Sequence, residues 1–253
     1  MSAEMKIGTT TAKPGEISKG SLGYVTLADG SKTHVPIINV NGKGDGPVLT
    51  VVSGVHGPEL TGIGALLGAL ENISPDEMRG ALLAIPGANP LAVRRGVYVS
   101  SIDKVNLSGP WYLPPIDDDP TITQRLAGFI NEAVDRADYL LDMHANPSPS
   151  MAFVITDLDL SVDKKTKEGT KNIARAFGVT SIDMPTKEAK SLRSICVKHG
   201  KPALTPELPG NILLQEEVME IGKIGIINVM RELGMIDGDI QEQPVEVIPG
   251  DLR

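Results

Sequence analysis

The stretch Val48-Leu49-Thr50-Val51-Val52-Ser53-Gly54-Val55-His56-Gly57-Pro58-Glu59 decides the fold of this 253-residue chain. Its first half is a short, continuous apolar run, which is typical of a strand buried on both faces. Small and apolar residues at helical spacing follow over residues 58–72. The stretch therefore predicts a buried strand that turns directly into a helix, as in sheets that are covered by helices.

The same alternation of buried strands and helices continues along the chain. Strands are expected at residues 81–85, 139–143, 152–156 and 203–205, and helices at residues 121–137, 164–177, 191–198 and 212–233. Upstream, a hairpin is expected, with strands at 22–27 and 34–40 joined by Ala28-Asp29-Gly30. This order predicts an α/β fold whose central, mostly parallel mixed sheet carries helices on both faces.

One main domain is expected. Residues 1–16 are polar and rich in turn-forming residues, which predicts a loose N-terminal arm before an α/β domain at residues 17–236. Residues 237–253 form a C-terminal tail, in which residues 243–248 have a strand-like pattern. Residues 90–120 hold several prolines and no clear period, and a connection of this length inside a compact domain is usually functional.

Composition and charge narrow the range of functions. The formal net charge is −8 and the pI is about 5.1, so nucleic acid and anionic membranes are poor partners for this acidic surface. No apolar stretch approaches the roughly 18 residues of a membrane span, and no N-terminal stretch has the pattern of a signal peptide. The single cysteine, Cys196, cannot form an internal disulfide, so a cytoplasmic location is expected.

Two histidines stand where predicted strands end, each with a carboxylate nearby. His56 and Glu59 are three residues apart at the strand-to-helix corner, and His144 follows residues 139–143 together with Asp142. Because the carboxyl ends of parallel strands gather ligands at one edge of a sheet, we expect these groups to meet. Imidazole nitrogen and carboxylate oxygen suit zinc. For each histidine alone, the alternative is an ordinary residue at a strand end or helix start.

Together these residues predict one zinc ion per chain, with one coordination position left open. His56, Glu59 and His144 would be its ligands, and Asp142, on the same side of its strand as His144, would orient that histidine. Glu207 follows a further predicted strand. A carboxylate there could take a proton from an activated water and pass it to a leaving nitrogen. Without the histidines, Glu207 would be interpreted as a solvated loop residue.

These motifs, in this order, resemble those of the succinylglutamate desuccinylase/aspartoacylase family, which has the zinc carboxypeptidase-like fold. The similarity extends from about Gly20 to about Gly234 and includes the corner at residues 54–59, Asp142-x-His144 and Glu207. The resemblance implies a zinc-dependent amidohydrolase that releases an acyl group from an N-acyl amino acid or a related amine. It also implies ligand roles for both histidines and the corner glutamate, and a general acid–base role for Glu207.

The loop after residue 90 departs from the family pattern. Tyr98 stands where family members carry an arginine that polarises the scissile carbonyl. A tyrosine hydroxyl could donate one hydrogen bond to the developing oxyanion, a weaker version of the same stabilisation. Packing of the loop by the aromatic ring is the alternative role for Tyr98.

The family's Asn-Arg pair for the substrate carboxylate is also changed. In a gapless match, Asn106 falls on an earlier family position and Ser108-Gly109 replace the pair; a shifted match puts Asn106 on the binding asparagine but still lacks the arginine. Neither replacement reproduces a bidentate arginine–carboxylate contact. Either the substrate lacks this carboxylate, or another arginine supplies the contact, the candidates being Arg94, Arg95 and Arg193.

The resemblance also bears on partners and on the C-terminus. The expected partner is a small N-acyl substrate, and the amphipathic pattern of residues 212–233 would suit the interface of a homo-oligomer. Many family members continue into a small β-domain, of which residues 237–253 would be the start. Two alternatives to the deacylase stay open: a carboxypeptidase-like peptidase, which the changed carboxylate-binding residues disfavour, and a non-catalytic binding module on the same fold.

Overall fold

The structure, a computed structural model, describes residues 3–109, 119–146, 150–184, 190–210 and 214–244. Its strands are β1 (Met5–Ile7), β2 (Thr10–Ala12), β3 (Glu16–Thr26), β4 (Lys32–Asn41), β5 (Gly44–Ser53), β6 (Arg79–Ile85), β7 (Tyr139–Asn146), β8 (Phe153–Thr156), β9 (Thr180–Asp183) and β10 (Ala203–Pro209). Its α-helices are α1 (Leu60–Leu70), α2 (Pro90–Val93), α3 (Ile122–Arg136), α4 (Lys164–Phe177), α5 (Leu192–Lys198) and α6 (Glu216–Glu232), and a 3-10 helix, η1, spans Leu158–Leu160.

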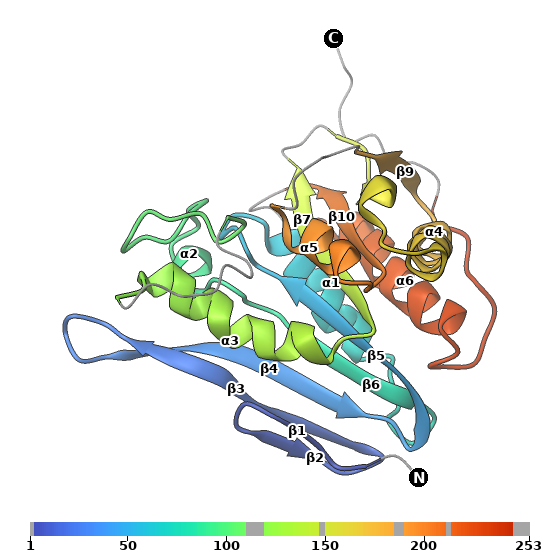
Figure 1. Cartoon of the computed structure of the whole chain (residues 1–253), viewed down its shortest axis with the longest axis horizontal. Helices are drawn as coiled ribbons and strands as arrows, with labels where there is room; N and C mark the ends of the chain where they lie inside the picture. The colour runs from blue at the N-terminus through green and yellow to red at the C-terminus, as the bar shows by residue number, and fades with distance from the viewer. Residues whose placement is uncertain (1–2, 110–118, 147–149, 185–189, 211–213, 245–253) are drawn as a thin grey trace.

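An eight-stranded mixed sheet forms the centre of the domain, in the order β3-β4-β6-β5-β7-β10-β8-β9 (Figure 1). The pairs β6–β5, β5–β7, β7–β10 and β8–β9 are parallel, whereas β3–β4, β4–β6 and β10–β8 are antiparallel. The predicted mostly parallel mixed sheet is therefore confirmed, with the parallel strands β6, β5, β7 and β10 at its centre and the parallel pair β8–β9 at one edge.

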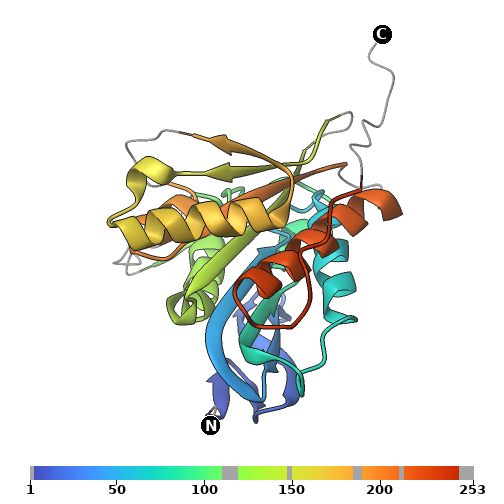
Figure 2. The same cartoon turned by 90° about the vertical axis from the view of Figure 1, so that its right-hand side faces the viewer.

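Helices cover both faces of this sheet, as predicted (Figures 1 and 2). Side chains alternate along the central strands, so that Leu49 and Val51 pack in one core with α1, α4 and α6, while Val52 packs in the other with α3 and α5. All three are fully buried. The continuous apolar runs in the sequence thus come from strands that are covered on both faces.

The N-terminal segment differs from the expected loose arm, because β1 and β2 form an antiparallel hairpin. Ile7 and Ala12 are buried, and two asparagines of β4 reach the hairpin backbone. Asn39 Nδ2 donates to the carbonyl of Met5 at 3.0 Å, and Asn41 Nδ2 donates to that of Ala12 at 2.9 Å. The segment is polar and has no clear local strand pattern. Its backbone is instead held by side-chain amides of β4, which is distant in sequence.

Two further differences concern connections. Residues 90–109 contain the short helix α2, and residues 110–118 of the predicted long loop lie outside the described residues. Of the strand-like segment 243–248, only the first two residues are described, and they lie outside any strand. In the described part of the chain, no helix combines the length and the hydropathy that crossing a membrane requires.

Candidate metal centre

Both histidines lie at the carboxyl edge of the sheet, where neighbouring strands end. Strand β5 ends at Ser53, and the chain turns at Gly54, whose φ of 70° is a conformation that favours glycine. This turn carries His56, and Glu59 is the residue that precedes α1. Strand β7 lies beside β5 and carries His144 near its end. The structure thus brings these three side chains together, as predicted.

These three side chains form a tight, buried group. His56 Nδ1 lies 2.7 Å from Glu59 Oε1, and His144 Nδ1 lies 2.9 Å from Glu59 Oε2. One potential ligand atom from each residue lies within 4.8 Å of the others. His56 is 4% exposed, Glu59 5% and His144 8%. Two imidazole nitrogens and one carboxylate that converge in this way fit a metal ion with an open position.

The charges within the group reinforce each other. Burial raises the pKa of Glu59, but hydrogen bonds from His144 and His56 outweigh it and leave this pKa lowered. Burial lowers the pKa of His144, but Asp142 and Glu59 outweigh it and hold this pKa well above its usual value. A metal cation can take the place of the proton between a carboxylate and a histidine ring, because it binds the carboxylate oxygen and the deprotonated ring nitrogen at the same time.

The outer nitrogen of each histidine ring also has a partner. His144 Nε2 lies 3.3 Å from Asp142 Oδ1, where the sequence predicted an orienting carboxylate. His56 Nε2 lies 3.1 Å from Asn106 Oδ1 and 3.2 Å from Ser108 Oγ, and the Ser108 amide donates to the same Asn106 oxygen at 2.9 Å. Such contacts fix the ring orientation and leave Nδ1 of each histidine toward Glu59. Asn106, expected to contact substrate, thus contacts His56.

We expect Asn106→Ala to weaken zinc binding by about 10–100-fold, the usual effect of removing a residue that supports a metal histidine. Zinc affinity would be measured by competition with a chromophoric chelator. Asn72→Ala is the matched control, because Asn72 is an exposed asparagine just after α1 whose side chain donates to the carbonyl of Gly68. Unchanged zinc affinity of Asn106→Ala would show that the contact with His56 is incidental.

Glu207 lies beside the group, on the strand next to His144. The two residues are direct partners in the parallel pairing of β10 with β7, so their side chains leave the same face of the sheet. The strand extends to Pro209, so Glu207 lies within it rather than after it. Burial raises the pKa of Glu207 to about 7, against the opposing influence of His144, and a cation at the histidines would lower it again.

Tyr98 covers the other side of His56. The two rings stack with centroids 3.8 Å apart and planes inclined by 12°, although the tyrosine is 55% exposed. Burial, Glu59 and Glu207 raise the pKa of Tyr98. Its hydroxyl is therefore a hydrogen-bond donor at neutral pH.

A cavity of about 460 Å³ joins these groups, and its lining includes Tyr98, Arg193 and Glu207. It also includes two polar residues that were not predicted, Asn146 and Thr205. In the described part of the chain, Asn146 Nδ2 and Thr205 Oγ1 are buried without a hydrogen-bond partner. Asn146 could have been found by alternation, since it continues the series of residues 142 and 144. Thr205 had no such signal.

The three candidate arginines are placed very differently. Arg193 is buried and lines the cavity. Arg94 and Arg95 are exposed and are not part of its described lining, and Arg94 Nη1 lies 3.5 Å from Thr33 Oγ1. Among the described residues that line the cavity, Arg193 is the one arginine, and no lysine is present.

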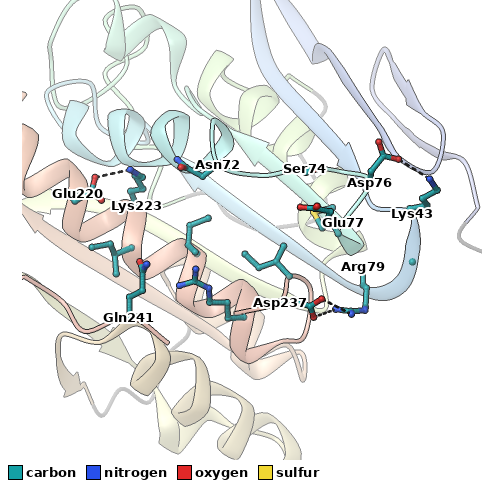
Figure 3. A pocket seen from close by; sticks show the side chains of 16 residues that line it. Lys43, Asn72, Ser74, Asp76, Glu77, Arg79, Glu220, Lys223, Asp237 and Gln241 are labelled. Carbon is teal, nitrogen blue, oxygen red and sulfur yellow. Dashed lines mark hydrogen bonds and ion pairs between the residues drawn. The ribbon is translucent and has the colours of Figure 1, made fainter. Parts of the chain in front are cut away.

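A larger cavity, of about 950 Å³, lies between α1, α6 and the start of β6 (Figure 3). Six of its charged side chains form three ion pairs: Lys43 with Asp76 at 3.1 Å, Arg79 with Asp237 at 2.9 Å and Lys223 with Glu220 at 3.1 Å. Cavity size therefore does not identify the candidate site here; the convergence of His56, Glu59, His144 and Glu207 does.

The sheet and the helices on both of its faces form an α/β domain with the zinc carboxypeptidase-like fold, and the buried histidine–glutamate group lies at the carboxyl edge of the sheet. A model of the succinylglutamate desuccinylase/aspartoacylase catalytic domain matches residues 45–233. The chain belongs to the succinylglutamate desuccinylase/aspartoacylase family.

Known relatives are similar over most of the chain. The N-alpha-acetyl-L-2,4-diaminobutyric acid deacetylase of Halomonas elongata is 26% identical over 214 residues, which are 82% of this chain and 60% of that protein. The chain thus spans less than two thirds of this relative. The ectoine utilization protein EutE of Ruegeria pomeroyi, solved with bound product, and a succinylglutamate desuccinylase of Silicibacter sp. TM1040 each share 24% identity with a TM-score of 0.78, over 90% of this chain and 70% of theirs. These two structures show the shared fold.

Proposed function

We propose that residues 17–236 form a zinc-dependent hydrolase domain that cleaves the amide of an N-acyl amino acid or a related N-acyl amine. The observation that carries the proposal is the buried carboxylate of Glu207 beside the group of His56, Glu59 and His144 in one cavity. The name of the Halomonas relative, a deacetylase of an N-acetylated diamino acid, supports the same reaction class.

The residues that would hold zinc are His56, Glu59 and His144, a set of two imidazoles and one carboxylate that is typical of catalytic zinc sites. Zinc bound there would polarise the scissile carbonyl and lower the pKa of a water molecule. Asp142 and Asn106 contact the outer nitrogens of the two rings and would keep these rings oriented for metal binding, which is why we assign Asn106 to the support of His56.

Glu207 would act as the general base and then as the general acid. As a carboxylate it takes a proton from the attacking water, and as a carboxylic acid it gives this proton to the leaving nitrogen when the amide C–N bond breaks. Burial raises the pKa of Glu207 to about 7 in the absence of a cation, and bound zinc would lower it, which favours the carboxylate form that accepts the proton near neutral pH. The products are the free acyl carboxylate and the free amine.

Tyr98 and Arg193 would position the substrate. The Tyr98 hydroxyl, protonated at neutral pH, would donate to the carbonyl oxygen as negative charge develops on it. Arg193 would bind a carboxylate of the amino-acid portion. Among the described residues that line the cavity, it carries the one cationic side chain other than the histidines.

A panel of N-acyl compounds tests this function. Zinc-loaded protein is expected to hydrolyse N-acetyl or N-succinyl amino acids, with kcat/KM about tenfold or more above that for the matching carboxamides, because the carboxamides lack the charge that Arg193 would bind. Product amines would be quantified chromatographically. Chelator-treated protein is the control, and its activity should return with added zinc. If the zinc-loaded protein hydrolysed no member of the panel, the proposal would be rejected.

We also propose a cytoplasmic location. The cysteine usage supports this location, because a single free thiol, Cys196, is typical of a reducing compartment, in which disulfides are rare. The apolar face of α6, which would suit an oligomer interface, packs in the core of the domain with α1 and α4.

A further inference from the structure

Arg193 is held by a fork of contacts to one carboxylate. Its Nε donates to Asp157 Oδ2 at 2.8 Å and its Nη2 donates to Asp157 Oδ1 at 3.4 Å. This side-on pairing occupies one edge of the guanidinium and leaves Nη1, with the second hydrogen of Nη2, outside the ion pair. The direction of the remaining edge is thereby fixed for a side chain that lines the cavity.

The acidic partner is itself deeply buried and lies outside the described lining of that cavity. The side chain of Asp157 is 0% exposed and that of Arg193 is 9% exposed. Taking two charges out of water costs free energy that their attraction repays only when the geometry is good, so a buried ion pair is weak evidence of a stabilising role. The pair instead provides orientation, which is what a carboxylate-binding arginine requires.

A second aspartate braces the turn that carries Asp157. Asp183 Oδ1 accepts hydrogen bonds from Thr156 Oγ1 at 3.0 Å and from the Leu158 amide at 2.9 Å, so it contacts the residues on both sides of Asp157. Asp183 ends β9, the edge strand of the sheet, all of whose residues are exposed. This strand buries little apolar surface, and its pairing with β8 brings Asp183 to the turn.

We propose that Asp157 is a positioning residue, which holds Arg193 in the orientation that binds the substrate carboxylate, and that Asp183 supports it from the sheet edge. This inference rests on the proposed function, in which Arg193 binds that carboxylate. Asp157 acts through Arg193 by removing rotamer freedom before the substrate arrives, so less conformational entropy is lost on binding.

Steady-state kinetics on Asp157→Asn test the inference. For an N-acetyl amino acid, KM is expected to rise by about tenfold or more with little change in kcat, whereas both parameters for the matching carboxamide stay as in the wild type. Zinc content should also be unchanged. Asp159→Asn is the matched control, because Asp159 is an exposed aspartate in the short helix η1, which Asp157 directly precedes, and it should behave as the wild type.

A double-mutant cycle separates positioning from a general structural effect. Arg193→Gln should raise KM for the carboxylate substrate, and adding Asp157→Asn to it should raise KM no further. The double variant also removes both buried charges, so it can be measured even where the single Asp157 variant, which leaves Arg193 unpaired, does not fold.

The possible results separate the two proposals. An active wild type whose KM for the carboxylate substrate is unaffected by Asp157→Asn, or is raised equally for the carboxamide, overturns the role of Asp157. Further loss of substrate affinity on adding Asp157→Asn to Arg193→Gln overturns it as well. A zinc-loaded wild type without activity on any N-acyl compound instead overturns the proposed function, and the positioning role with it.

Discussion

Replacement of Glu207 by glutamine is expected to lower kcat by on the order of 10²–10⁴-fold while the protein keeps its metal. Glutamine has nearly the same shape but cannot accept a proton from water or deliver one to the leaving nitrogen at neutral pH. Glu207 is also not one of the three residues that form the candidate metal group, so zinc should stay bound. The substitution removes the proposed proton transfer and leaves the ligand set intact.

Activity and zinc content must be measured on the same preparations of Glu207→Gln. We expect stoichiometric zinc by inductively coupled plasma mass spectrometry, and a residual rate that added zinc does not raise. Glu217→Gln serves as the control, since Glu217 is exposed in the first turn of α6 and should leave the rate unaltered. A rate for Glu207→Gln close to that of the wild type would contradict the proton-transfer role.

Replacement of His144 by alanine is expected to remove zinc from the protein and to reduce hydrolysis to background. The substitution deletes one of the three converging ligands and leaves Glu59 with a single histidine partner. The loss of zinc affinity should exceed the roughly 10–100-fold that removal of a supporting residue causes. Asn106→Ala therefore gives a scale against which His144→Ala is compared.

The control for this variant is His34→Ala, which removes an exposed histidine whose ring lies 5.4 Å from that of Tyr24. It should keep one zinc ion per chain. Circular dichroism of His144→Ala would show whether the domain still folds, so that loss of metal can be separated from loss of structure. A folded His144→Ala that retains stoichiometric zinc would exclude the proposed ligand set.

The sequence was sufficient to predict the parts of this site that depend on strand ends. His56 follows β5, His144 and Glu207 lie near the ends of β7 and β10, and parallel strands bring their carboxyl ends to one edge. The helices were equally readable, because periodicity and capping residues are local; α4 spans Lys164–Phe177 as expected, and Gly178 ends it at a φ of 87°.

The parts that were not predicted depend on contacts between distant residues. Ser108 lies against His56 across 52 positions of sequence, and Asp157 pairs with Arg193 across 36. Neither residue has a local signal, since an isolated serine or aspartate in a connection is usually solvated. The hairpin formed by β1 and β2 also depends on contacts between distant residues, because asparagines of β4 hold its backbone.

The direct pairing of Glu207 with His144 in neighbouring parallel strands has a consequence for how this domain can change over evolution. Their common orientation is set by the register of backbone hydrogen bonds, and a shift of register by one residue would turn Glu207 to the opposite face of the sheet. Substitutions along β10 can leave this register intact, whereas one inserted or deleted residue between Ala203 and Glu207 cannot. We expect variation of length to be confined to the connections, while the strands that carry the two residues vary only in composition.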